Sequence, residues 1–226
     1  MDPESDRVFF NVPRLNGLIG KDHGAFNPHE KEIYLKWMPE DGGYVALHKY
    51  KGKFNMYTEA RDGDQYPVPV WKKKFKHKLH KLDLQNGSLQ EIRYLPKELL
   101  ALHVHYGMNY LNVPLSVLPK GLVSLVFSHS HFPFNGRSLK SLKKLQVLEA
   151  RNKSVLSIPK LPKSIKWLNF ENSNLGGGFG PGLKNFKLKD HPNLKFLNVR
   201  GSGIKKKDIP QELLDAKKSK KIQFYY

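Results

Sequence analysis

The chain has 226 residues, and its 39 Lys and Arg residues outnumber 20 Asp and Glu, which gives a net charge of +19 at pH 7. It contains no cysteine, which excludes a disulfide scaffold and a thiolate metal site. No apolar run reaches the roughly 18 residues of a membrane-spanning helix, and the acidic start, Met1 to Asp6, has neither the apolar core of a secretory signal nor the arginines of a transit peptide. We therefore expect an intracellular protein, in the cytoplasm or within a large particle.

The first seventy residues are predicted to form an N-terminal arm and a β-hairpin cap. Tyr44–Tyr50 and Phe54–Tyr57 flank a short turn that contains Gly52, the pattern of a hairpin, and Ile33–Met38 is predicted to be a third strand. Residues 7–30 are rich in Gly, Asn and Pro but hold more apolar residues than a disordered tail. We expect this arm to lie against the next domain or against a partner.

Aromatic and basic residues alternate directly after this region. The alternation suits stacking on unpaired bases together with phosphate contacts. The other interpretation, which we favour for the rings, is a first strand in which Trp71, Phe75 and Leu79 cover the open end of a core. The lysines can contact phosphate in either case, and they are Lys72, Lys73, Lys74, Lys76 and Lys78.

From residue 79 onward the pattern L-x-x-L-x-L, or a close apolar variant, returns seven times at steps of 20 to 29 residues. The fourth and sixth positions alternate, so one short strand turns both inward. A further apolar residue follows at the eleventh position in five of the first six instances. A single unit cannot bury these groups, whereas stacked units can, so the period predicts a solenoid over residues 71–226. The instances begin at Leu79, Leu99, Leu122, Leu145, Ile165, Leu194 and, imperfectly, Ser219, which leaves Ile222 and Phe224 at the fourth and sixth positions of the last one.

This pattern resembles the leucine-rich repeat family, whose consensus is L-x-x-L-x-L-x-x-N/C-x-L. Leu-Pro pairs at Leu95, Leu118 and Leu161 precede three repeats, as in the LPX-type repeats of some bacterial effectors and in FNIP-type repeats. The resemblance implies an α/β-type solenoid of about six to seven short parallel strands, with mostly irregular outer segments and the N-terminal hairpin as a cap. We expect outer helices only at Ser138–Leu148 and Gln211–Lys218.

The chain departs from the family at the turn that follows each strand. The ninth position, where the family has Asn, holds Gly, Ser or Lys. Asn86, Asn152 and Asn172 lie one residue earlier. We therefore expect a looser turn than usual.

The resemblance also implies that the third, fifth and seventh positions line a concave face. In this chain those positions hold a mixture of polar, charged and aromatic residues, including an exposed Trp167–Phe196 pair. We expect the face to bind protein. The candidate residues are His103, His105, Glu149, Arg151, Trp167, Asn169, Phe196 and Arg200.

The excess of positive charge is confined to the repeat region. Residues 1–70 hold 9 Lys and Arg against 11 Asp and Glu, whereas residues 71–226 hold 30 against 9. The plainer explanation is that the lysines keep the protein soluble. The excess is large for solubility alone, however, and it indicates a polyanionic partner. The lysines lie in runs at 72–78, 140–144, 160–166, 184–189, 205–207 and 217–221, in turns and outer segments. Besides the five lysines before the first repeat, the candidate contacts are Lys140, Lys143, Lys144, Lys205, Lys206, Lys207, Lys217, Lys218 and Lys220.

Catalytic and metal motifs are weak in this sequence. His103 and His105 precede a second pair, His129 and His131, by one repeat, but no carboxylate lies beside them, so we expect no metal. Residues 176–182 are glycine-rich yet lack the Gly-Lys-Ser/Thr ending of a phosphate-binding loop, which favours a flexible insertion. No Gly-x-Ser-x-Gly elbow occurs. We expect no enzyme activity, cofactor or small-molecule substrate.

The sequence thus predicts a non-catalytic scaffold. The first hypothesis is an accessory or structural subunit of a large nucleic-acid-containing assembly, such as a ribosome-like particle or a virion. In it, a basic edge contacts RNA or another polyanion through the phosphate backbone, and the concave face contacts neighbouring proteins. The alternative is a free-standing adaptor or effector that binds a single protein ligand in the concave face.

Overall fold

The computed structural model of the chain describes the backbone of residues 33–37, 44–50, 53–59 and 79–85. It describes side chains as well for residues 80–82, 95–105, 113–130, 132–152, 155, 157–176 and 182–226.

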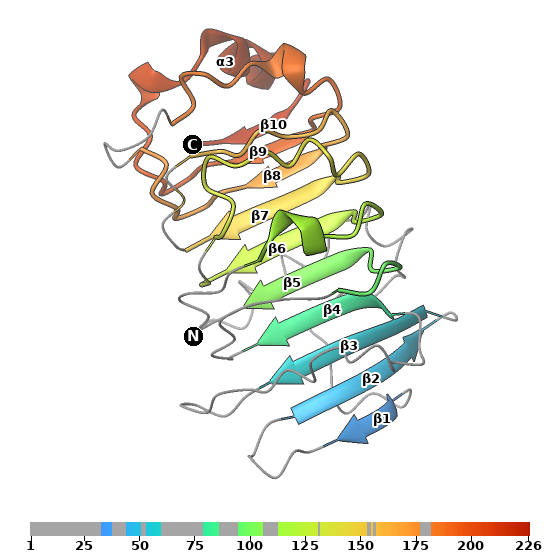
Figure 1. Ribbon diagram of the computed structural model, residues 1–226. Coiled ribbons are helices and arrows are strands. Elements are labelled where there is room, and N and C mark those ends of the chain that lie inside the picture. The colour runs from blue at the N-terminus through green and yellow to red at the C-terminus, as the bar shows by residue number, and fades with distance from the viewer. Residues whose placement is uncertain are drawn as a thin grey trace.

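The described strands form one open sheet in which each strand pairs with the next one in the sequence (Figure 1). The first three are antiparallel, which confirms the predicted hairpin and third strand. The strands from β4 onward all run parallel, as a solenoid-like arrangement requires, and β3 joins the two parts by pairing in parallel with β4. The strands are β1 (Ile33–Trp37), β2 (Tyr44–Tyr50), β3 (Lys53–Glu59), β4 (Leu79–Gln85), β5 (Ala101–His105), β6 (Ser124–Ser128), β7 (Val147–Arg151), β8 (Trp167–Asn169), β9 (Phe196–Asn198) and β10 (Gln223–Tyr225).

The fourth-position residues stack in register from strand to strand and are fully buried between the sheet and the outer segments. Leu125, for example, pairs with Leu102 on one side and Leu148 on the other, and none of the three has any exposed surface. The sixth position is equally buried, from Val104 to Val199. Burial at about 25 cal/mol per Å² makes this continuous row the main source of stability.

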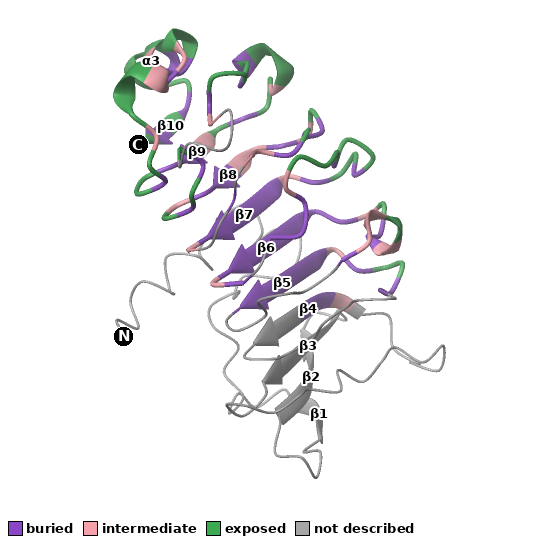
Figure 2. Ribbon diagram, turned by 60° about the vertical axis from the view of Figure 1, so that its left-hand side comes forward, coloured by how far each residue is buried: buried purple, intermediate pink, exposed green. Residues whose placement is uncertain are grey.

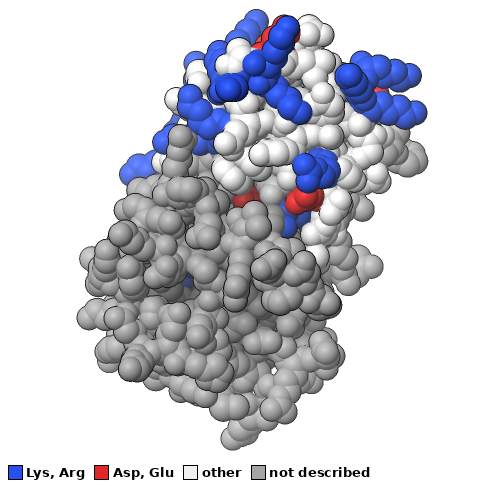
Figure 3. All heavy atoms as spheres, turned by 180° about the vertical axis from the view of Figure 1, so that it is seen from behind, with Lys and Arg blue, Asp and Glu red and all other residues white. Residues whose placement is uncertain are grey.

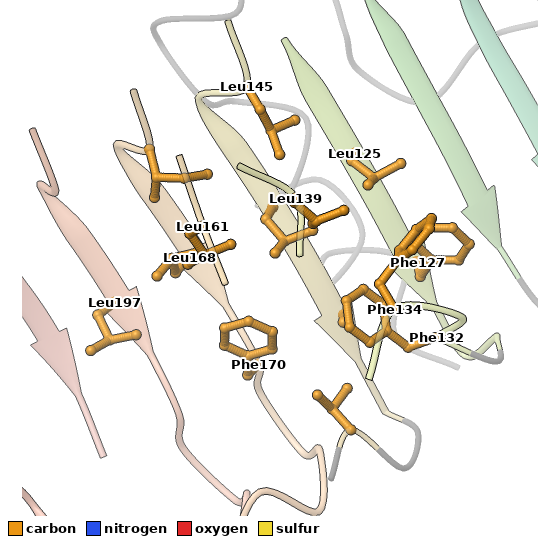
Figure 4. Packing of buried hydrophobic residues seen from close by; sticks show 14 of the residues in the cluster. Leu125, Phe127, Phe132, Phe134, Leu139, Leu145, Leu161, Leu168, Phe170 and Leu197 are labelled. Atoms are coloured by element: carbon orange, nitrogen blue, oxygen red, sulfur yellow. The ribbon is translucent and has the colours of Figure 1, made fainter. Parts of the chain in front are cut away.

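A cluster of three phenylalanines fills the core beneath β6 (Figure 4). Phe127 and Phe132 occupy predicted core positions, and Phe134, which the repeat pattern does not mark, lies against both. The ring centroids are 5.6 to 5.9 Å apart and the rings meet edge to face. Such pairs stabilise by about 0.5–1.5 kcal/mol beyond the area they bury.

The helix predicted over Ser138–Leu148 is wrong. Leu139, Leu142 and Leu145 are buried as expected, but consecutive three-residue turns place them, with Leu142 N–H bonded to Leu139 O and Leu145 N–H to Leu142 O. Leu139 N–H bonds to Lys160 O in the next outer segment and Gln146 N–H bonds to Val123 O, so bonds between repeats replace those of a helix.

The second predicted outer helix is confirmed as α3 (Gln211–Lys218), which begins after Pro210 and buries Leu213 and Ala216. The other described helical segments are single 3-10 turns, η1 (Leu115–Val117), η2 (Leu188–Asp190) and η3 (Lys206–Asp208). None of the described helices combines the length and the apolar character that crossing a membrane requires.

The last repeat is shifted by two residues from its predicted register. Phe224 pairs with Leu197 and therefore occupies the fourth position rather than the sixth. Gln223 and Tyr225 accordingly take the third and fifth positions. The repeat begins at Lys221, where no apolar residue marks its start.

The turns after the strands are held by a ladder at the eighth position, and the looser turn expected from the sequence is wrong where the turns are described. His129, Asn152, Asn172 and Gly201 all have a left-handed backbone, with φ between 51° and 67°. Asn152 Nδ2 lies 3.0 Å from His129 Nε2, and Asn172 Nδ2 donates to Asn152 Oδ1 over 3.0 Å. A side chain at Gly201 would collide with Asn172 Oδ1, so glycine occupies the eighth position of the next repeat and the side-chain bonds end at Asn172.

This ladder predicts different costs for two substitutions at its centre. Asn152→Gly removes both side-chain bonds and is expected to lower the free energy of unfolding by about 1 kcal/mol. Asn152→Ala also forces a residue with Cβ into the left-handed region and is expected to cost about 2 kcal/mol or more. Urea unfolding measures both, with Asn174→Ala, an exposed asparagine outside the ladder, as the control. Equal stability of all three variants would contradict the ladder.

Candidate protein and polyanion interfaces

The concave face is far less accessible than the sequence predicted. His103, His105, Glu149, Arg151 and Asn169 are all buried, with exposed fractions of 1 to 6%. Figure 2 shows the same for the whole of β5, β6 and β7. The five candidate residues on these strands are therefore not accessible to a partner in this structure.

Polar side chains on this face interact with one another. His103 Nε2 lies 3.1 Å from Ser124 Oγ on the next strand, and the rings of His103 and His105 meet edge to face at 6.1 Å. Arg151 Nε lies 3.6 Å from Glu149 Oε2 on the same strand.

Glu149 has a strongly shifted acidity. Burial raises its pKa to about 7, and the nearby Glu171 carboxylate adds to the rise. The Arg151 guanidinium and the Trp167 side chain oppose it, because both favour the charged carboxylate. Glu149 therefore changes charge near neutral pH inside the sheet.

Among the described strands, the accessible side chains of this face lie at its C-terminal end and include a row of aromatic rings. Trp167 and Phe196 are half-buried and stack with ring centroids 3.5 Å apart at 3°. Tyr225 continues the row at 5.6 Å from Phe196 and is 40% exposed. Arg200, which is exposed, lies over the Tyr225 ring at 5.5 Å. The repeat pattern assigns Tyr225 to the seventh position of the last repeat, and its pairing with Asn198 places it at the fifth position of the same face.

The nine candidate lysines from residue 140 onward are all exposed, on outer segments and around α3. Figure 3 shows Lys and Arg side chains gathered in separate groups over the C-terminal part of the chain, with uncharged surface between them. The ion pair from this region, Lys184 with Asp208 at 3.5 Å, neutralises none of the nine. The five earlier candidates, Lys72 to Lys78, lie outside the described residues.

Three outer segments meet around a groove of about 680 Å³, which we call the lysine groove. Its walls come from the turn before β7, the segment of residues 158–164 before β8 and the segment of residues 182–191 before β9. Besides Lys140 and Lys143, three further lysines line it that are not among the candidate contacts. In the sequence, only the lysine runs at 160–166 and 184–189 pointed to them. The added lysines are Lys160, Lys163 and Lys187.

Metal binding has no support in the part of the chain that is described. No group of three or more His, Asp or Glu side chains there is placed to hold a metal ion. His131, from the second histidine pair, lies outside that part, and His129 belongs to the turn ladder.

Comparison with known proteins finds no matching family model, no similar curated protein and no similar solved structure. The parallel, sequence-ordered sheet and the surfaces described above therefore stand on their own geometry.

Glu149 predicts a specific dependence of stability on pH. Between pH 4.5 and 7 the unfolded chain releases the Glu149 proton while the folded chain keeps it, so rising pH lowers the free energy of unfolding. Relative to Glu149→Gln, the native protein is expected to lose about 2 kcal/mol between pH 5 and pH 8. Urea unfolding of both proteins at the two pH values measures this difference. Loss of the Arg151 ion pair changes the free energy of unfolding of the variant by the same amount at both pH values, so it cancels in the comparison. A difference in free energy of unfolding between the two proteins that is the same at pH 5 and pH 8 would contradict the raised pKa.

Proposed function

We propose that this protein is a non-catalytic scaffold of leucine-rich-repeat type, an accessory or structural subunit of a large nucleic-acid-containing assembly. Its exposed lysines contact the phosphate backbone of RNA or DNA, and other surfaces contact neighbouring proteins. Sequence-specific reading of bases is not part of the proposal.

The repeat assignment is supported by the in-register leucines and by the ladder at the eighth position. In the consensus, an Asn or Cys after the strand satisfies backbone groups in the turn. Here Asn152 and Asn172 stand one residue earlier and bond to each other from repeat to repeat. Buried serines at the ninth position, Ser130 and Ser202, bond to backbone carbonyls in place of the family asparagine.

The nucleic-acid proposal is carried by one observation, the excess of exposed and uncompensated lysine on the outer segments. These side chains lie on several consecutive repeats, so together they form an extended field rather than a single point charge. Such a field suits a polyanion, whose condensed counterions are released when lysines replace them.

A second candidate function follows from the aromatic end of the concave face. Trp167, Phe196 and Tyr225 present a row of rings beside the exposed Arg200, and aromatic residues with Arg are enriched at protein interfaces. A free-standing adaptor that binds one protein ligand there would use this row. Trp167→Ala would then abolish capture of that ligand without changing affinity for nucleic acid.

The charge proposal predicts a change in salt dependence. Lys206→Gln with Lys207→Gln removes two exposed charges beside η3 and is expected to lower the slope of log affinity against log salt by about one to two for RNA or DNA. Fluorescence anisotropy with a labelled oligonucleotide at several salt concentrations measures the slope. The matched control is Lys97→Gln with Lys120→Gln, two exposed lysines on the earlier repeats.

The control distinguishes the effect of losing these two C-terminal lysines from the effect of lowering the net charge of the protein. We expect the control pair to change the slope by less than half as much. No measurable binding of the native protein to any nucleic acid at low salt would overturn the proposed function.

A further inference from the structure

We propose that the lysine groove is a binding site for single-stranded nucleic acid, in which lysines hold the phosphates and the apolar floor takes a base. This inference rests on the proposed function. It specifies where on the protein nucleic acid binds and that the bound nucleic acid is single-stranded.

The charge around the groove is one-sided. Lys140, Lys143, Lys160, Lys163 and Lys187 all line it and all are exposed, so their ammonium groups stand on the rim. Asp190 is the one acidic residue in the lining. Five like charges around one groove repel one another, and an anion that enters it relieves this repulsion.

The floor of the groove is apolar. Pro159, Leu161, Pro162 and Phe186 line it and are buried, so they lie beneath the lysine rim. His191 stacks on Phe186 with ring centroids 4.8 Å apart. Burial lowers the pKa of His191, an effect that Asp190 opposes and Lys140 reinforces, which favours the neutral ring. A flat, neutral aromatic surface of this kind suits stacking of a base.

The dimensions favour a single strand over a duplex. A groove of about 680 Å³ lies within the range of sites for small organic ligands, and it holds more than an isolated phosphate. In a duplex the bases are paired and stacked, so they cannot reach an apolar floor, whereas an unpaired base can turn into it. Lysines on both walls then contact the phosphates that flank this base.

The backbone of the walls argues against an acidic peptide as the occupant. A bound peptide needs partners for its own N–H and C=O groups. Lys160 N–H and C=O are both used in bonds to the neighbouring segment, at Arg137 and Leu139. Pro159 and Pro162 have no N–H, and Ser164 Oγ donates to Leu145 O at 2.7 Å. A ligand here must bind through charge and an apolar face, as a nucleotide does.

The three segments that form the walls are fixed by the fold. Ser138 and Lys160 form a parallel bridge, and Asn193 Nδ2 donates to Lys163 O over 2.9 Å. The groove therefore spans consecutive repeats that the stacked core holds in place, and its lysines converge without a conformational change.

The test uses the full chain and a labelled twelve-nucleotide oligo-dT. The groove variant carries Lys143→Gln, Lys160→Gln and Lys163→Gln, and the control carries Lys97→Gln, Lys120→Gln and Lys195→Gln, with the same loss of charge outside the groove. Both sets are exposed, and thermal unfolding checks that both variants fold. We expect the affinity of the groove variant for oligo-dT to fall at least tenfold and its slope of log affinity against log salt to fall by about two. We expect the slope of the control variant to fall by less than half as much.

A second measurement locates the strand directly. An oligonucleotide that contains 5-iodouracil is cross-linked by light, and mass spectrometry identifies the attached peptide. We expect attachment within residues 158–164 or 182–191, and weaker binding of a blunt twelve-base-pair duplex.

The outcomes separate this inference from the proposed function. Binding of nucleic acid with equal losses in the two triple variants, or with cross-links only outside the groove, would overturn the groove and leave the proposed function standing. No binding of oligo-dT, RNA or duplex would overturn both. Groove-dependent binding of a poly-glutamate peptide that exceeds binding of oligo-dT would overturn the inference in favour of an acidic protein partner.

Discussion

The apolar residue at the fourth position of a repeat is buried because the neighbouring strands hold apolar residues in register with it. Leu125 has Leu102 and Leu148 as its partners, and no residue within its own repeat could cover it. The same stacking places every other repeat position in a row. The polar cluster around Glu149, the aromatic row at Trp167 and the convergence of lysines on the outer segments are consequences of this one constraint.

The buried positions of the strands could be predicted from the sequence, because the period of the apolar residues indicates on which side of a strand they lie. The buried rows were predicted in this way, the N-terminal hairpin from the turn at Gly52, and α3 from its start after Pro210. The segment from Ser138 to Leu148 was not, because spacings of three suit both a helix and successive turns. Bonds from Leu139 and Gln146 to adjacent repeats decide between them, and no local pattern records those bonds.

The candidate surfaces were harder to predict for a related reason. A repeat alignment says that Glu149 and His103 share a face, but it does not say whether that face is accessible, and both are buried. For the lysines the opposite holds, since charge runs such as Lys160 to Lys166 predict exposure well. Whether these lysines lie around one groove depends on the conformation of three outer segments. These segments have no regular spacing, so the sequence does not predict their conformation. The Asn152 ladder likewise needs a left-handed backbone, which the repeat pattern does not mark.

A fold whose stability comes from stacked repeats can vary its outer segments without disturbing its core, and here those segments carry the excess of lysine. The most direct test of the account is to purify the native protein with its partners and to size the complex with and without nuclease at two salt concentrations. Migration with a large particle, from which nuclease or high salt releases the protein, is the predicted result. A small complex that neither treatment changes would contradict a role in a nucleic-acid-containing assembly.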